Sequence, residues 1–239
     1  MITTHLKKLR QRFAINAEEE SAIRAAVADT RKIGADKVLI REGQPLNESL
    51  LLVSGWLARS KDLAGGERQM TELHVTGDFP DLHGFTLKRL DHDLLTLSDC
   101  TLAVVPHDRV RRMIERFPRL GRIYWFMTNM DAAIHREWAL SLGKRSAISR
   151  MAHLFCELNL RLDVVGETRG DCYHFPLTQR ELAECLGLTA VHANRTLQEL
   201  RRRGLIALEN REVSLLDRSG LESVAEVDPA YLYLEKRAI

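Results

Sequence analysis

Several signatures of common protein classes are missing from this chain of 239 residues. No uninterrupted apolar run is long enough to cross a bilayer, and the charged N-terminal segment has no apolar core of a signal peptide. The formal net charge is only +2, so any attraction to nucleic acid must come from a local cluster of basic residues. We therefore expect a cytosolic protein of two domains, each with a core of its own.

Patterns of metal-binding and redox residues are also absent. The four cysteines include no Cys-x-x-Cys pair, and their wide spacing favours buried, reduced thiols: Cys100, Cys156, Cys172 and Cys185. The nine histidines contain no His-Glu-x-x-His motif. Metal binding by His83, His92 or His135 is open in principle, but no spacing supports it. The sequence therefore predicts no metal site and no catalytic residues, and we expect no enzyme.

Residues 177–206 carry the most specific pattern, two short helices joined by a glycine turn. Thr178 and Glu181 form a capping box at the start of the first helix, and Gly187 suits its left-handed end. Thr189 can cap a second helix, with its inward stripe at Ala193, Leu197 and Leu200. The small residues at the crossing and the tight turn are typical of a helix-turn-helix.

The opposite face of the second helix is polar or cationic and would face DNA. There Asn194 can read adenine, Arg195 can read guanine or hold a phosphate, and Val191 can contact a thymine methyl group. His192 is either a DNA contact or an inert shoulder of the helix. The predicted DNA-binding residues are Thr178, Gln179, Thr189, Val191, His192, Asn194, Arg195, Gln198, Arg201 and Arg202. Arg203 completes a basic run that could hold phosphates.

Two apolar stretches follow Gly204 on either side of a polar turn at residues 209–212. They predict a β-hairpin, which would make the motif a winged helix-turn-helix. Asn210 and Arg211 would lie at the wing tip, where they either contact a phosphate or face solvent.

The first half of the chain predicts helix, then strands, then a long helix. A helical pattern within residues 6–29 gives way to β-prone pieces at 37–40, 49–61, 68–75 and 94–105, separated by glycines. Their spacing suggests an antiparallel barrel or jelly roll, with a hairpin turn at Gly65 and Gly66. After a short helix at 107–117, a helix from Pro118 to about Gly143 carries apolar residues at coiled-coil spacing: Leu120, Ile123, Met127, Met130 and Ile134. We expect this stripe to pair with a second chain in a homodimer, although a globular core could bury it as well.

This order of barrel, long helix, hinge and winged helix-turn-helix resembles the Crp/Fnr superfamily of bacterial transcription regulators over nearly the whole chain. The resemblance implies an α+β fold with a cyclic-nucleotide-binding-like β-roll at 1–117, a dimerisation helix and hinge at 118–145, and a DNA-binding domain at 146–239. It also implies a homodimer on a near-palindromic operator with its two recognition helices about 34 Å apart, and RNA polymerase as a partner. A small molecule or another signal at the β-roll would gate DNA binding.

The signal cannot be taken over from the cAMP-responsive members. Those members follow a Gly-Glu with an Arg and a small hydroxylated residue that hold the cyclic phosphate, whereas this chain has Gly77-Asp78 and then Lys88-Arg89-Leu90-Asp91-His92. The resemblance places effector contacts at Gly77, Asp78, Arg89, His135 and Arg136. We expect neither cAMP nor an iron–sulfur cluster, because the cluster of cysteines near the N-terminus of the oxygen-sensing members is missing; a haem on His74 or His83, or no ligand at all, stays open.

Two other classes of function are compatible with parts of the sequence. A metal-dependent enzyme could be built on the barrel, but it would need converging ligands. A signalling adaptor could use the winged domain to bind protein.

Val191 stands where the superfamily usually has a Glu, so the operator should differ from that of the cAMP activator.

Overall fold

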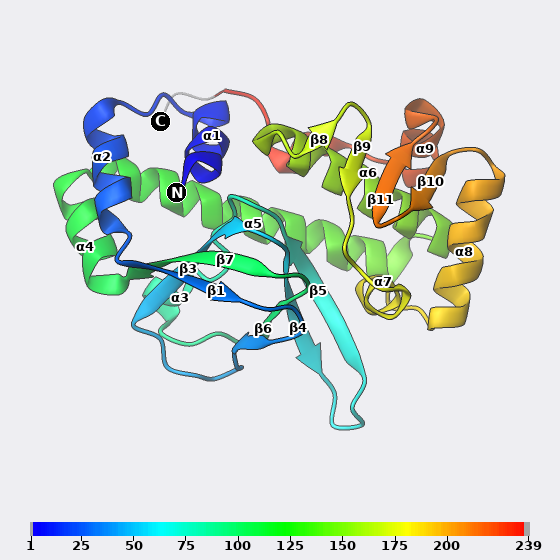
Figure 1. Cartoon of the computed structure of the whole chain (residues 1–239), viewed down its shortest axis with the longest axis horizontal. Coiled ribbons are helices and arrows are strands. Elements are labelled where there is room, and N and C mark those ends of the chain that lie inside the picture. The colour runs from blue at the N-terminus through cyan, green and yellow to red at the C-terminus, as the bar shows by residue number, and fades with distance from the viewer. Residues whose placement is uncertain (1, 237–239) are drawn as a thin grey trace. The chain divides into compact units, whose positions relative to one another are not determined.

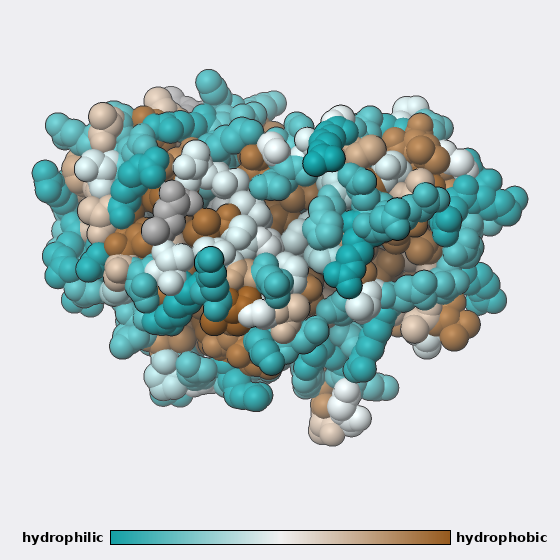
Figure 2. All heavy atoms as spheres, viewed as in Figure 1, coloured by the Kyte–Doolittle hydropathy of each residue, from teal (hydrophilic) through white to brown (hydrophobic). Residues whose placement is uncertain are grey.

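The computed structural model describes residues 2–236, which form two units (Figure 1). The first unit contains residues up to Ser60, Leu73–Ala133 and the segment from Leu232 onward; the second contains Lys61–Glu72 and Ile134–Tyr231. Hydrophilic residues cover most of the surface that faces the viewer in Figure 2. The predicted α+β class, with a β-roll, a long helix and a winged helix-turn-helix, is confirmed.

The β-roll consists of two antiparallel sheets. A three-stranded sheet has the order β1-β7-β3, and a four-stranded sheet has the order β2-β6-β4-β5. Gly55, with φ of +99°, separates β3 from β4, so the predicted strand at 49–61 is two strands. The strands are β1 (Asp29–Ile33), β2 (Val38–Ile40), β3 (Glu48–Ser54), β4 (Leu57–Asp62), β5 (Arg68–His74), β6 (Asp93–Thr96) and β7 (Cys100–Pro106).

Strand β1 was not predicted, because its sequence DTRKI is mostly polar and exposed. It pairs with β7 over its whole length, from Asp29 opposite Val104 to Ile33 opposite Cys100. Backbone hydrogen bonds to the buried strand β7 therefore determine that these residues form a strand, whereas the periodicity of their side chains does not indicate one.

Helices pack against the roll and extend from it. Asn16 and Glu19 form a capping box at the start of α2. Pro118 begins the long helix and separates it from α4, as predicted. These helices are α1 (Thr3–Arg12), α2 (Ala17–Ala26), α3 (Gly84–Leu87), α4 (His107–Arg116) and α5 (Pro118–Lys144).

The apolar stripe of α5 does not form the predicted intermolecular seam. Leu120, Ile123, Met127 and Met130 are at most 8 % exposed and belong to the core of their own unit, together with residues of α1 and α4. The stripe has the spacing of a coiled coil, but the chain's own helices cover it. The large apolar side chains that stay exposed on α5 are Trp125, at 69 %, and Leu140, at 49 %.

The second unit is built on α6 (Ala147–Val165), which begins at the N-cap Ser146 and ends at the left-handed Gly166. A four-stranded sheet has the order β10-β11-β9-β8. The remaining elements are β8 (Thr168–Arg169), β9 (Cys172–His174), α7 (Gln179–Leu186), α8 (Ala190–Arg202), β10 (Ile206–Glu209), β11 (Glu212–Leu215), α9 (Arg218–Ala225) and the 3-10 helix η1 (Pro229–Leu232).

Candidate nucleic-acid interface and effector site

The helix α7 begins and ends as its sequence predicts. The Thr178 hydroxyl accepts a hydrogen bond from the Glu181 backbone N–H, and the Glu181 carboxylate accepts from the Thr178 backbone N–H. Gly187 takes φ of +60°, a conformation that costs glycine little, and ends the helix. The chain thus turns after two helical turns, and three residues separate the end of α7 from the start of α8.

The helix α8 buries one face and exposes the other. Thr189 caps it by accepting from the His192 backbone N–H, and Ala193, Leu197 and Leu200 are at most 3 % exposed. Val191 is 78 % exposed, although burial of its side chain would be favourable. The other exposed residues of the predicted reading face are His192, Arg195, Gln198, Arg201 and Arg202.

A side-chain bond joins the two helices of the motif at this face. The Asn194 side-chain amide donates to the side-chain amide oxygen Oε1 of Gln179 over 2.9 Å. The sequence pattern predicted both residues as DNA contacts but did not predict the hydrogen bond between them. Because the bond holds both amides in place, a base or phosphate would meet groups that are already oriented.

The basic run after the reading face has weak partners. Arg202 and Arg203 both lie within 2.8 Å of the Glu199 carboxylate, and Arg201 lies 3.9 Å from Glu209. These pairs are exposed, and exposed pairs contribute at most about 1 kcal/mol each. The arginines can therefore exchange their carboxylate partner for a phosphate at little cost.

The predicted wing is a β-hairpin of β10 and β11. Asn210 and Arg211 at its tip have φ of +51° and +60°, the two positive values of a type I′ turn. A second hairpin, β8 with β9, extends the same sheet, since Val213 of β11 pairs with Tyr173. This hairpin was missed; the turn signal at Gly170, with φ of +63°, could have indicated it.

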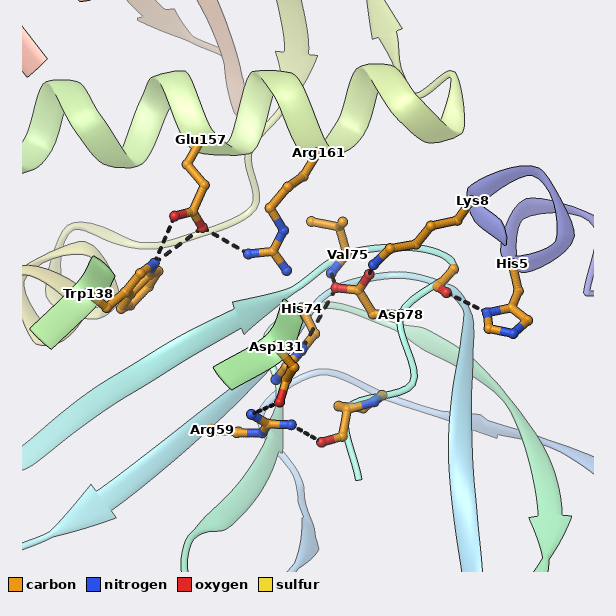
Figure 3. A network of polar contacts seen from close by, with 12 residues as sticks. His5, Lys8, Arg59, His74, Val75, Asp78, Asp131, Trp138, Glu157 and Arg161 are labelled. Atoms are coloured by element: carbon orange, nitrogen blue, oxygen red, sulfur yellow. Dashed lines mark hydrogen bonds and ion pairs between the residues drawn. The ribbon is translucent and has the colours of Figure 1, made fainter. Parts of the chain in front are cut away.

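The proposed effector residues Gly77 and Asp78 lie in a turn against α1. His5 donates from Nδ1 to the Gly77 carbonyl oxygen over 2.9 Å. Lys8 bonds the Asp78 carboxylate, which also accepts from the Val75 backbone N–H over 3.0 Å (Figure 3). The polar groups of this turn thus have partners within the chain, and Asp78 is only 4 % exposed.

The sensor unit also buries charged residues that the sequence did not single out. Arg59, in β4, bonds Asp131 of α5 over 2.7 Å and donates to the Pro80 carbonyl oxygen (Figure 3). Burial is the main cause that lowers the pKa of His74 to about 4, and the charge of Arg59 adds to it. A single Arg in a strand usually indicates a solvent-facing side chain, so no local sequence signal predicted the pair of Arg59 with Asp131.

The other predicted effector residues are exposed. Arg89 lies in the loop after α3, where its backbone forms an isolated antiparallel β-bridge with Pro45. His135 and Arg136 lie on α5. Instead of an Arg with a hydroxyl neighbour, the loop at 83–92 brings together His83, Asp91 and His92. These residues, and the Lys8-bound Asp78, do not fit the phosphate of a cyclic nucleotide.

Within residues 2–236, no helix has both the length and the apolar character needed to span a membrane.

Comparison with known proteins agrees with this geometry. Residues 30–117 match the model of the cyclic nucleotide-binding domain, and residues 149–224 match that of the Crp-like helix-turn-helix domain. The chain is 23 % identical to the transcriptional activator protein FnrA of Stutzerimonas stutzeri over 89 % of this chain and 87 % of that protein. It is 28 % identical to the transcriptional activator protein FnrL of Cereibacter sphaeroides over 81 % of this chain and 78 % of that one.

A solved structure shows the same fold. FixK2 from Bradyrhizobium japonicum superposes with a TM-score of 0.73, at 22 % identity, over 89 % of this chain and all of that one. The two matched domains, the regulators that share most of their length with this chain, and the exposed helix α8 lead to one conclusion. The chain belongs to the Crp/Fnr family of transcription regulators, which bind DNA through a helix-turn-helix.

Proposed function

We propose that this regulator binds a near-palindromic operator as a homodimer, with α8 of each protomer in a major groove. The exposed face of α8 carries the proposal, because its one large apolar side chain, Val191, is 78 % exposed among polar neighbours. Arg195 and Asn194 would contact base edges, and Val191 a thymine methyl group. Gln198 and His192 complete the reading face.

Phosphate contacts would surround this face. Thr178 and Gln179 at the start of α7, Thr189 at the start of α8, and the run Arg201, Arg202 and Arg203 are the groups that we assign to them. The wing tip at Asn210 and Arg211 is a further phosphate contact.

Dimerisation would use the exposed side of α5. Trp125 and Leu140 are large apolar side chains that the chain itself leaves in water, and large exposed apolar groups are favoured at protein interfaces. Relatives with this architecture act as transcriptional activators, so RNA polymerase is the further partner that we propose. The role is regulatory rather than enzymatic and is carried out in the cytoplasm.

We further propose that the domains are residues 1–117 for the sensor, 118–145 for the dimerisation helix and hinge, and 146–239 for DNA binding. A signal at the sensor would gate DNA binding. Cyclic AMP is not the signal in this proposal, because the turn at Gly77 and Asp78 bonds to α1 and no hydroxyl-assisted arginine follows it.

The test is Arg195→Ala on an operator selected in vitro from random DNA with the wild-type protein. We expect specific binding to weaken by about 1–3 kcal/mol, that is, by about fivefold to 150-fold, in a fluorescence anisotropy titration at fixed salt. Arg112→Ala is the matched control, since Arg112 of α4 is also an exposed helical arginine but lies outside the helix-turn-helix. Equal affinity of the two variants would refute the role of Arg195.

A further inference from the structure

The loop between β5 and β6 brings two histidines and an aspartate together. His83 precedes α3, and Asp91 and His92 precede β6. The two imidazole ring centroids are 5.5 Å apart, and one ligand atom from each of His83, Asp91 and His92 lies within 4.8 Å of the others. Nine positions separate the histidines in sequence, which matches no metal motif, so only the fold reveals the cluster.

Backbone bonds hold the loop in this conformation. Lys88 ends α3 with φ of +65°, and its carbonyl oxygen accepts from the Leu46 N–H over 2.8 Å. Leu90, 2 % exposed, anchors the next turn in the core, and its carbonyl oxygen accepts from the Gly43 N–H. These backbone hydrogen bonds, at Lys88 and Leu90 between the two histidines, therefore fix the loop that brings His83 and His92 together.

The state of His92 points to a ligand. Its side chain is 9 % exposed; Nδ1 donates to the Asp91 carboxylate over 2.9 Å, while Nε2 is buried and has no hydrogen-bond partner. A buried polar atom without a partner is rare in native proteins. In a typical metal-binding histidine, one ring nitrogen donates its proton to a carboxylate, and the lone pair of the other ring nitrogen binds the metal.

The charges around the cluster suit a cation. Arg59 is the positive group that faces both histidines, and Asp131 bonds it over 2.7 Å. Asp91 then adds a negative charge beside the imidazole of His92.

We propose that His83 and His92 bind one divalent transition-metal ion of the Zn²⁺ class in the sensor unit, while Asp91 orients the His92 ring through Nδ1 and water supplies the remaining ligands. Imidazole nitrogen suits Zn²⁺ and its neighbours in the first transition row, whereas Mg²⁺ and Ca²⁺ prefer all-oxygen sites. This site goes beyond the proposed function, because it is independent of how α8 reads DNA.

The experiment measures metal binding by the full-length protein after removal of metals with a chelator. Zn²⁺ is titrated in competition with a chromophoric chelator, and Co²⁺ is added separately as a spectroscopic probe of ligand geometry. We expect one equivalent of Zn²⁺ to bind and to raise the melting temperature, as a ligand of the native state does. His83→Ala should lower the affinity at least tenfold and remove this rise.

Two further variants keep the test decisive. His92→Gln should also lose at least tenfold in affinity, and its circular dichroism shows whether it is folded; His83 is only half-buried, so His83→Ala tests the site even if His92→Gln unfolds. His174→Ala, an exposed histidine on β9, is the matched control and should bind as the wild type does. Zn²⁺ binding that is unchanged in His83→Ala, or equally weakened in His174→Ala, would overturn the proposal.

Discussion

Two glutamates of the second unit hold arginines in opposite settings. Glu157, in α6, is fully buried and accepts bonds from Trp138 and Arg161 (Figure 3). It also accepts a bond from the Tyr231 hydroxyl. Glu199, in α8, has a side chain that is 31 % exposed and pairs with Arg202 and Arg203. The Glu157 carboxylate stabilises the fold through these bonds. The Glu199 carboxylate only pairs with two arginines, which can bind another anion in its place.

The physical difference is the cost of breaking each group of bonds. A buried ion pair that loses one partner leaves a charge in a medium of low dielectric constant, whereas an exposed pair is replaced by water. The same pair of residue types is therefore structural in α6 and exchangeable in α8. This contrast predicts which substitutions change stability and which change DNA binding.

The largest effect should come from Glu157→Ala. It removes the acceptor of the Trp138 indole N–H, the Arg161 guanidinium and the Tyr231 hydroxyl at once. We expect the free energy of unfolding of this unit to fall by about 3–5 kcal/mol, measured by urea denaturation followed by circular dichroism. A loss below about 1 kcal/mol would show that Glu157, like Glu199, is not required for the stability of this unit.

A buried histidine of the first unit extends the contrast to protonation. Burial is the main cause that lowers the pKa of His5 to about 4, below its unfolded value of 6.5. A lowered pKa means that the neutral ring stabilises the fold above pH 6.5 and that this contribution is lost as the pH falls toward 4. His5→Asn keeps a donor for the Gly77 carbonyl oxygen but cannot titrate.

We therefore expect the pH dependence of stability between 6.5 and 4 to be shallower in His5→Asn than in the wild type, by up to about 1.4 kcal/mol per pH unit. Denaturation midpoints at several pH values measure the difference. Parallel curves for the two proteins would show that His5 does not titrate differently in the folded chain. His174→Asn, on the surface, serves as the control.

Local signals predicted the helix-turn-helix because its determinants lie within a few residues of one another. The Thr178 capping box, the Gly187 turn and the stripe at Ala193, Leu197 and Leu200 each act over one or two helical turns. The bond between Asn194 and Gln179 escaped prediction, since it depends on how the two helices cross.

Long-range features of the sensor could not be predicted in the same way. Lys8 and Asp78 are 70 residues apart, and Arg59 and Asp131 are 72 apart, so no periodicity links them. The stripe of α5 was assigned to a dimer seam because a coiled coil and a globular core require the same spacing. Which one covers it depends on α1 and α4, elsewhere in the sequence.

The smallest effect concerns the exposed carboxylate itself. Glu199→Gln should leave the free energy of unfolding nearly unchanged, since the site is on the surface. It should tighten binding to non-specific DNA several-fold at low salt, because Arg202 and Arg203 lose a competing anion. Salt titrations of the variant and the wild type measure this; weaker binding by Glu199→Gln would mean that the carboxylate orients the arginines rather than competing for them.

If the outer face of α8 reads bases, a substitution of its exposed Val191 should change the preferred operator. Selection of operators from random DNA is carried out in parallel with the wild type and with Val191→Glu. Because a carboxylate accepts from the cytosine amino group, whereas a valine contacts a thymine methyl group, we predict that preference changes toward cytosine at one symmetric position of each half-site. Identical operators from the two proteins would contradict the placement of this face against the bases.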